Sequence, residues 1–306
     1  MKNSENKGGN EAIASLPPST ESAIELKNIT KRFGHVVANS DVNLKVRTGT
    51  IHGIVGENGA GKSTLMNILF GLYKPDSGMI FLNGQAVDVN SPEKSIALGI
   101  GMVHQHFMLV PTFTVLENAM LGNEGSMLLR SGEEVVLDRL KGLSNNSGLD
   151  VDFEAIISDT PVGMQQRVEI LKALNRGAKI LILDEPTGVL TPQETIGLFD
   201  ILRSLREQGV TIILITHKLK EIMSITDTVS VMRGGKVVAD FSTGKTSPEE
   251  LAENMVGRKV LLSIKKPTLK VGKPVLEVKN VSHESKDGVL VLKNISFDLK
   301  EGEILG

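Results

Sequence analysis

The sequence predicts an α/β protein built around a parallel β-sheet. Three apolar runs, at residues 50–56, 179–184 and 210–216, have the length and the β-branched content of buried strands. Between them lie longer stretches, such as residues 165–174, in which apolar residues recur at helical spacings of three and four. Strands that are apolar on both faces need helices on both sides of the sheet, so we expect helices and strands to alternate around one core.

The composition of the 306 residues argues against several classes of function. The chain has 34 Lys and Arg against 36 Asp and Glu, a formal charge of -2, which gives no electrostatic basis for binding nucleic acid or an anionic bilayer. Cysteine is absent, which excludes disulfides, thiolate metal sites and a cysteine nucleophile. No apolar run reaches the roughly 20 residues that a membrane-spanning helix needs, so we expect the chain not to form a channel itself.

The chain opens with a polar segment and then turns to strands. Residues 1–22 contain paired glycines and paired prolines and lack the apolar core of a secretory signal, so we expect a disordered tail. Strand patterns follow at residues 23–30 and 36–46, and the run at 50–56 leads into a glycine-rich loop. A helix is predicted from Lys62 to Leu72 and a further strand at residues 78–84.

Helical periodicity dominates the middle of the chain, from about Thr114 to Ala178. The strand at 179–184 follows, and a helix is predicted to begin near Pro192. Another helix should follow the strand at 210–216, after His217. Residues 229–241 form two strand patterns separated by a pair of glycines, which suits a hairpin turn.

A weak internal repeat connects the two ends of the chain. Residues 24–30 (IELKNIT) are echoed by 276–282 (LEVKNVS), and residues 43–53 (NLKVRTGTIHG) by 296–306 (SFDLKEGEILG). In the first copy the glycine-rich loop opens three residues after Gly53, whereas the second copy ends at its equivalent, Gly306. We therefore expect residues 274–306 to be the incomplete start of a second domain. The alternative is two unrelated hairpins that share turn chemistry.

The glycine-rich loop has the pattern of a phosphate-binding loop. GENGAGKST satisfies GxxxxGK[ST], with a strand before it and a helix after it, which is the context that this loop requires. Its glycines let backbone N–H groups surround phosphate oxygens, Lys62 can reach the outer phosphates, and the Ser63 hydroxyl can bind Mg²⁺. The residues predicted to bind nucleotide here are Gly56, Glu57, Asn58, Gly59, Ala60, Gly61, Lys62, Ser63 and Thr64.

Two further strand ends supply the remaining chemistry of a nucleotide site. The strand at 179–184 ends in Asp184, which is placed to hold Mg²⁺ through water, and Glu185 follows, placed to orient or deprotonate an attacking water. An acidic turn after a strand is common by itself, but it is improbable by chance beside a phosphate-binding loop. His217 follows the next strand at the edge of the sheet where α/β proteins bind ligands.

These motifs together resemble the nucleotide-binding domain of ABC transporters. The phosphate-binding loop, HQHF at 104–107, VGMQQR at 162–167, ILILDEP at 180–186 and His217 occur in the order and spacing of that family over about residues 23–258. The resemblance implies ATP and Mg²⁺ as ligands, a P-loop NTPase fold of the ABC type with an antiparallel β subdomain, and a helical subdomain at about 112–177. It further implies that Gln105 senses Mg²⁺ and the γ-phosphate, that His217 contacts this phosphate, and that Phe33 stacks on adenine. The alternative for Phe33 is an ordinary core position.

A finer resemblance points to importers. Residues 101–122, together with VGMQQRVEILKAL and DEPTGVLTPQE, look like the tandem ATPases of the simple-sugar and nucleoside import group. That group implies a peripheral protein at the cytoplasmic face of the membrane that works with permease subunits, with a second nucleotide-binding domain and, indirectly, with a substrate-binding protein. Nucleic acid is not an expected partner, and residues 259–273 would be the linker to the second domain.

The chain also departs from the family pattern. Thr160 and Pro161 stand where the signature LSxGxxQ has Leu and Ser, while Gly163 and Gln166 are retained, and GVLT at 188–191 lacks the usual closing Asp. A proline removes a backbone donor, and the hydroxyl that would bind a γ-phosphate across a dimer is missing. Two alternatives therefore stay open, an ABC ATPase that acts outside transport and a truncated chain that binds ATP without hydrolysing it.

Overall fold

A computed structural model describes residues 21–105, 107–121, 129–259, 272–285 and 288–305. The chain divides into two compact units, residues 1–260 and 261–306. Most of the predicted tail at 1–22 and of the predicted linker at 259–273 lies outside the described residues, as do residues 106 and 122–128.

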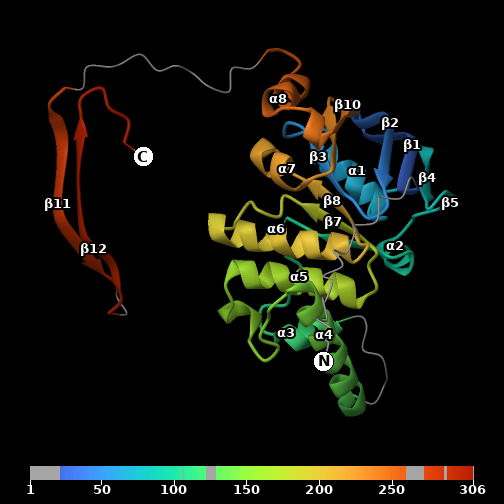
Figure 1. The fold of residues 1–306 in the computed structure, drawn as a ribbon, viewed down its shortest axis with the longest axis horizontal. Helices are drawn as coiled ribbons and strands as arrows, with labels where there is room; N and C mark the ends of the chain where they lie inside the picture. Colours follow the sequence, from blue (N-terminus) through green and yellow to red (C-terminus); the bar gives the residue numbers. More distant parts are fainter. Residues whose placement is uncertain (1–20, 106, 122–128, 260–271, 286–287, 306) are drawn as a thin grey trace, which may run out of the picture. The chain divides into compact units, whose positions relative to one another are not determined.

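The centre of the first unit is a six-stranded sheet with the order β10-β9-β3-β8-β7-β6 (Figure 1). Its strands pair in parallel except at the edge, where β10 runs antiparallel to β9. Every residue of the four strands β3, β6, β7 and β8 is buried, as expected of strands covered on both faces. The predicted parallel α/β core is thus confirmed. The strands are β3 (Ile51–Val55), β6 (Ile100–Val103), β7 (Ile180–Asp184), β8 (Thr211–Ile215), β9 (Thr228–Arg233) and β10 (Lys236–Ser242).

A second, antiparallel sheet has the order β2-β1-β4-β5. Helix α1 (Lys62–Leu69) contributes Leu65, Met66 and Ile68 to the core that lies between the two sheets. This helix ends three residues before the predicted Leu72, because Gly71 takes φ 80° and any Cβ at that position would lie 2.5 Å from the Ser91 carbonyl oxygen. The strands are β1 (Ser22–Phe33), β2 (Val36–Arg47), β4 (Ser77–Leu82) and β5 (Gln85–Val87).

Helices cover the parallel sheet and form a separate layer beside it (Figure 1). Two of them, α3 and α6, begin with reciprocal capping boxes at Thr114 and Thr191. The region predicted to be mostly helical is interrupted between Gly148, at φ 69°, and Pro161, where Ile156 instead bridges to Thr114. Besides α1, the described helices are α2 (Pro92–Ala97), α3 (Val115–Met120), α4 (Leu129–Ser147), η1 (Ile157–Asp159), α5 (Val162–Asn175), α6 (Pro192–Glu207), α7 (Leu219–Ile225), η2 (Thr243–Lys245) and α8 (Pro248–Val256). None of the helices in the described ranges is long and apolar enough to cross a membrane.

The second unit contains a hairpin of β11 (Pro274–Glu284) and β12 (Leu290–Lys300). It repeats the backbone of β1 and β2 in detail. Asn28 and Asn280 both adopt φ 52°, and Asp41 and Asn294 adopt φ 48° and 51°, values that residues other than glycine rarely take. The register agrees as well, since Leu26↔Leu44 and Ile29↔Val42 correspond to Val278↔Phe297 and Val281↔Ile295. The sequence repeat is therefore also a repeat of local conformation.

Candidate nucleotide site

The predicted phosphate-binding loop lies between β3 and α1, at the carboxyl edge of the parallel sheet. It lines a cavity of about 680 Å³. Three other segments far away in the sequence reach the same cavity, with Gln105 after β6, Glu185 after β7 and His217 after β8. The structure therefore places Lys62, Ser63, Gln105, Glu185 and His217 around one cavity, whereas the predicted Gly56, Glu57 and Asp184 are not among its lining residues. The lining residues are Val36, Val37, Ala38, Asn58, Gly59, Ala60, Gly61, Lys62, Ser63, Thr64, Gln105, Glu185, Gly188, His217 and Lys218.

The loop can follow this path because of its glycines. Gly61 has φ 97° and precedes α1, and a Cβ there would lie 2.3 Å from the Ala38 carbonyl oxygen. A Cβ on Gly56 would lie 2.4 Å from the Met232 carbonyl oxygen. Asn39, a buried residue that the sequence analysis did not single out, donates its amide to the Gly61 carbonyl at 3.1 Å. The glycines thus let neighbouring strands approach the loop and hold its shape.

Lys62 lies across the loop, with only 7% of the residue exposed. Its ammonium donates hydrogen bonds to the carbonyls of Gly56 at 2.7 Å and Glu57 at 3.0 Å. Burial lowers the pKa of Lys62, while the carboxylates of Glu185 and Asp184 act in the opposite direction. The ammonium is thus preorganised beside the two acidic residues at the end of β7.

Asp184 ends β7 with 8% of the residue exposed. Burial raises the pKa of its carboxyl group, a hydrogen bond from Ser63 lowers it, and the neighbouring charge of Glu185 raises it further. The side chains of Ser63 and Asp184 are therefore in contact, and Gln105 lines the same cavity as Ser63. A hydroxyl, a carboxylate and an amide oxygen fit the hard oxygen ligands that Mg²⁺ takes when phosphates and water complete its shell. The described residues contain no group of three or more His, Cys, Asp and Glu side chains placed to hold a metal by themselves.

Glu185 and His217 meet at the edge of the cavity. The Nδ1 atom of His217 lies 2.8 Å from Oε1 of Glu185. The other carboxylate oxygen, Oε2, is buried and has no hydrogen-bond partner among the described residues. Glu185 also has φ 49°, a strained value for a residue with a side chain, and strain of this kind is typical of functional sites. One oxygen is thus fixed by the histidine, and the other is left to accept a hydrogen bond.

Phe33 and the signature-like segment, which the family resemblance connects with nucleotide binding, do not line the cavity. Phe33 packs edge-on against Tyr73, with ring centroids 5.2 Å apart, and Val36 and Val37 line the cavity in its neighbourhood. The signature-like segment lies at the start of α5, where Pro161 is the N-cap and the Thr160 hydroxyl donates to the Ile157 carbonyl at 2.8 Å. Neither group belongs to the lining, so adenine stacking by Phe33 stays a prediction.

The buried Gln166 of this segment donates to the Pro186 carbonyl at 2.7 Å, which connects α5 to the loop after Glu185. Sequence reasoning noted Gln166 only as a retained family residue. Its partner is twenty positions away, and no local pattern indicates such a contact.

A parallel sheet with this loop and these strand ends defines a P-loop nucleotide-binding domain. Residues 39–188 match the model of the family described as ABC transporter, and the chain belongs to that family. It is 48% identical to the nucleoside import ATP-binding protein NupA of Lactococcus lactis over 94% of this chain and 57% of that protein. It is 49% identical to the guanosine import ATP-binding protein NupO of Bacillus subtilis over 94% of this chain and 56% of that protein.

Among solved structures, this chain resembles over part of its length a bacterial ABC transporter cassette solved as a dimer, MJ0796. The TM-score is 0.61 at 28% identity, over 72% of this chain and 98% of that one. The present chain spans little more than half the length of the curated relatives that it matches.

Proposed function

We propose that this chain binds and hydrolyses ATP as part of an importer, and that it drives nucleosides or simple sugars through a separate permease. The observation that carries the proposal is the pair of Glu185 and His217, which lies at the phosphate-binding cavity with one carboxylate oxygen unpaired. The names of the relatives, nucleoside and guanosine import ATP-binding proteins, support this class of solute.

The mechanism follows from the positions of the side chains. The N–H groups of the loop at 56–64 and the Lys62 ammonium hold the phosphates of ATP. Glu185 orients water toward the γ-phosphorus with its carboxylate and takes up the proton of this water as the bond to the leaving ADP oxygen breaks. His217 keeps Glu185 in the required orientation. Ser63, Asp184 and Gln105 would hold Mg²⁺, which supplies charge neutralisation on the phosphate oxygens when it is bound.

A second nucleotide-binding domain would complete the site. The signature-like segment at the start of α5 does not line this chain's own cavity, so it is free to face the cavity of another domain. The dimeric cassette and the greater length of the relatives support such pairing. We infer that residues 23–258 form the first nucleotide-binding domain, with its helical subdomain at about 112–177, that 259–273 connect it, and that 274–306 begin the second. The conformational repeat of β1 and β2 in β11 and β12 supports that division.

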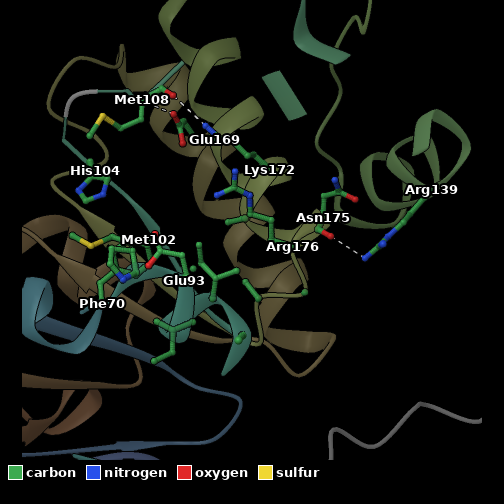
Figure 2. A pocket seen from close by; sticks show the side chains of 18 residues that line it. Phe70, Glu93, Met102, His104, Met108, Arg139, Glu169, Lys172, Asn175 and Arg176 are labelled. Carbon is green, nitrogen blue, oxygen red and sulfur yellow. Dashed lines mark hydrogen bonds between the residues drawn. The ribbon is translucent and has the colours of Figure 1, made fainter. Parts of the chain in front are cut away.

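A second cavity, of about 750 Å³, is a suitable docking place for the permease. It is lined by residues of α2, β6 and α5, and Figure 2 shows its apolar wall and its basic side chains. Phe70, Met102 and Met108 provide the apolar surface. Lys172 and Arg176 provide positive charge, and the Nε of Arg176 is buried without a hydrogen-bond partner among the described residues. An amphipathic permease segment with a carboxylate would complement the positive charge of Lys172 and Arg176.

This cavity is also connected to the nucleotide site. His104 lies in its wall, directly before Gln105, and stacks edge-on against Phe70 at 5.9 Å. A permease segment seated here would therefore contact the strand end that carries Gln105. The proposal puts the protein at the cytoplasmic face of the membrane, held there by the permease.

The test of the proposed chemistry is Glu185→Gln. We expect unchanged ATP affinity and a loss of turnover of at least about a hundredfold, because an amide cannot take up the proton. ATP binding is measured by equilibrium titration and turnover by phosphate release, with Glu207→Gln on an exposed helix end as the matched control. Retained turnover in Glu185→Gln would contradict the assignment of the base.

The test of the docking cavity is Arg176→Met. The variant should co-purify less with membrane vesicles that contain the permease, while Lys236→Met, an exposed position on β10, should not change co-purification. If the chain instead co-sediments with ribosomes and ignores these vesicles, the transport function is wrong and an ABC ATPase of another class is favoured.

A further inference from the structure

The loops that carry Glu185 and His217 are joined by a second set of contacts beyond the contact between those two residues. The ammonium of Lys218, which directly follows His217, donates to the carbonyl oxygen of Thr187 at 2.9 Å and to its hydroxyl at 3.0 Å. Thr187 is only two residues after Glu185 and is 1% exposed. The loop after β7 and the loop after β8 are therefore connected twice, once through Glu185 and once through Thr187.

Glu221 closes this second connection into a cluster. Its Oε2 accepts a hydrogen bond from the Thr187 hydroxyl at 2.7 Å, and its Oε1 lies 3.2 Å from the Lys218 ammonium. The Glu221 side chain is 12% exposed and that of Lys218 is 38% exposed. The cluster is thus partly shielded from water, which strengthens its charged hydrogen bonds.

The bonding of the ammonium argues against a direct role in phosphate binding, even though Lys218 lines the nucleotide cavity. An ammonium has three N–H donors. In this structure it meets three acceptors, the Thr187 carbonyl, the Thr187 hydroxyl and the Glu221 carboxylate. To reach a phosphate, Lys218 would have to give up part of a partly buried network.

We propose that Lys218 is a positioning residue, which holds Glu185 and His217 together by fixing Thr187. Glu185 keeps a strained φ of 49°, and a strained residue stays in place only when its surroundings fix it. Gln166 holds the preceding residue, Pro186, from the side of α5, and Lys218 holds Thr187 from the side of α7. The catalytic consequence rests on the proposed function, whereas the restraint on the loop does not.

The experiment compares Lys218→Met with Lys220→Met in the 306-residue chain. Lys220 is an exposed residue two positions later whose side chain makes no hydrogen bond or ion pair in the described part of the chain, so it controls for the loss of a charge near the start of α7. Hydrogen exchange followed by mass spectrometry on peptides covering residues 185–191 reports on the loop. ATP affinity is measured by titration, and kcat and KM by phosphate release.

We expect Lys218→Met to speed exchange in residues 185–191 by about tenfold or more, since charged hydrogen bonds are lost. ATP affinity and KM should stay within about twofold and kcat should fall by about tenfold, because only the alignment of Glu185 changes. Lys218→Arg, which keeps the charge and the donors, should restore slow exchange and most of kcat. Lys220→Met should match the unmodified chain.

Two results would overturn the proposal. Unchanged exchange in Lys218→Met would mean that Thr187 is fixed without the lysine. A fall in ATP affinity of about tenfold at unchanged exchange would make Lys218 a phosphate ligand instead. If the unmodified chain binds no ATP, the proposed function fails, and the exchange measurement still decides whether Lys218 restrains the loop.

Discussion

Two glycines of the phosphate-binding loop allow a quantitative test of its geometry. Gly59 and Gly61 both have positive φ, 81° and 97°. A Cβ on Gly59 would meet nothing within 4 Å, whereas a Cβ on Gly61 would lie 2.3 Å from the Ala38 carbonyl oxygen and 2.8 Å from Nδ2 of Asn39. Alanine at either site would adopt a strained left-handed conformation, but only at Gly61 must the backbone of β2 also move.

The left-handed conformation costs an alanine about 1–2 kcal/mol, and overpacking against buried backbone adds about 1–3 kcal/mol. We therefore expect Gly61→Ala to lower the free energy of unfolding by about 2 kcal/mol more than Gly59→Ala. For a domain of this size that difference corresponds to roughly 4–8 °C in Tm. Gly61→Ala should also weaken ATP binding more, because Gly61 precedes the first turn of α1.

Thermal unfolding by differential scanning calorimetry and ATP titration of both variants give the two comparisons. Equal losses of stability in Gly59→Ala and Gly61→Ala would refute the reasoning, since they would show that the contact with Ala38 does not restrain the loop. A Gly61→Ala variant that unfolds at the temperature of the unmodified chain would refute it as well.

Two other predictions concern stability. His52 is fully buried between Thr228 and Ser230, and burial lowers its pKa to about 4 from an unfolded value of 6.5. As the pH falls, the unfolded chain therefore binds a proton on His52 before the folded chain does. The free energy of unfolding should fall by about 3 kcal/mol between pH 6.5 and pH 4. In urea titrations, His52→Gln should make the free energy of unfolding depend less on pH over this range. Thr191→Val removes the hydroxyl that caps α6 and should cost about 1 kcal/mol in the same assay, while Thr195→Val inside the helix should cost less.

Local patterns were sufficient for most of the fold. The strands at the centre of the sheet are rich in apolar residues, and the phosphate-binding loop has a strand before it and a helix after it. These elements can therefore be predicted from short, contiguous stretches of the sequence. The same holds for the turn at Gly234 and Gly235, where φ is 55° and 76°. The helix α1 ends before the predicted Leu72, because Gly71 interrupts a run of apolar residues that otherwise continues the helical pattern.

The sequence by itself determined the class of fold, the phosphate-binding loop and the acidic strand end, because each depends on a short, contiguous pattern. Only the tertiary structure decided which strands are neighbours, and β8 lies directly beside β7 although α6 separates them in the chain. That adjacency places His217 2.8 Å from Glu185 and Lys218 beside Thr187. Contacts between residues more than thirty positions apart in the chain depend on how the strands and helices pack, and no local periodicity of the sequence encodes such contacts.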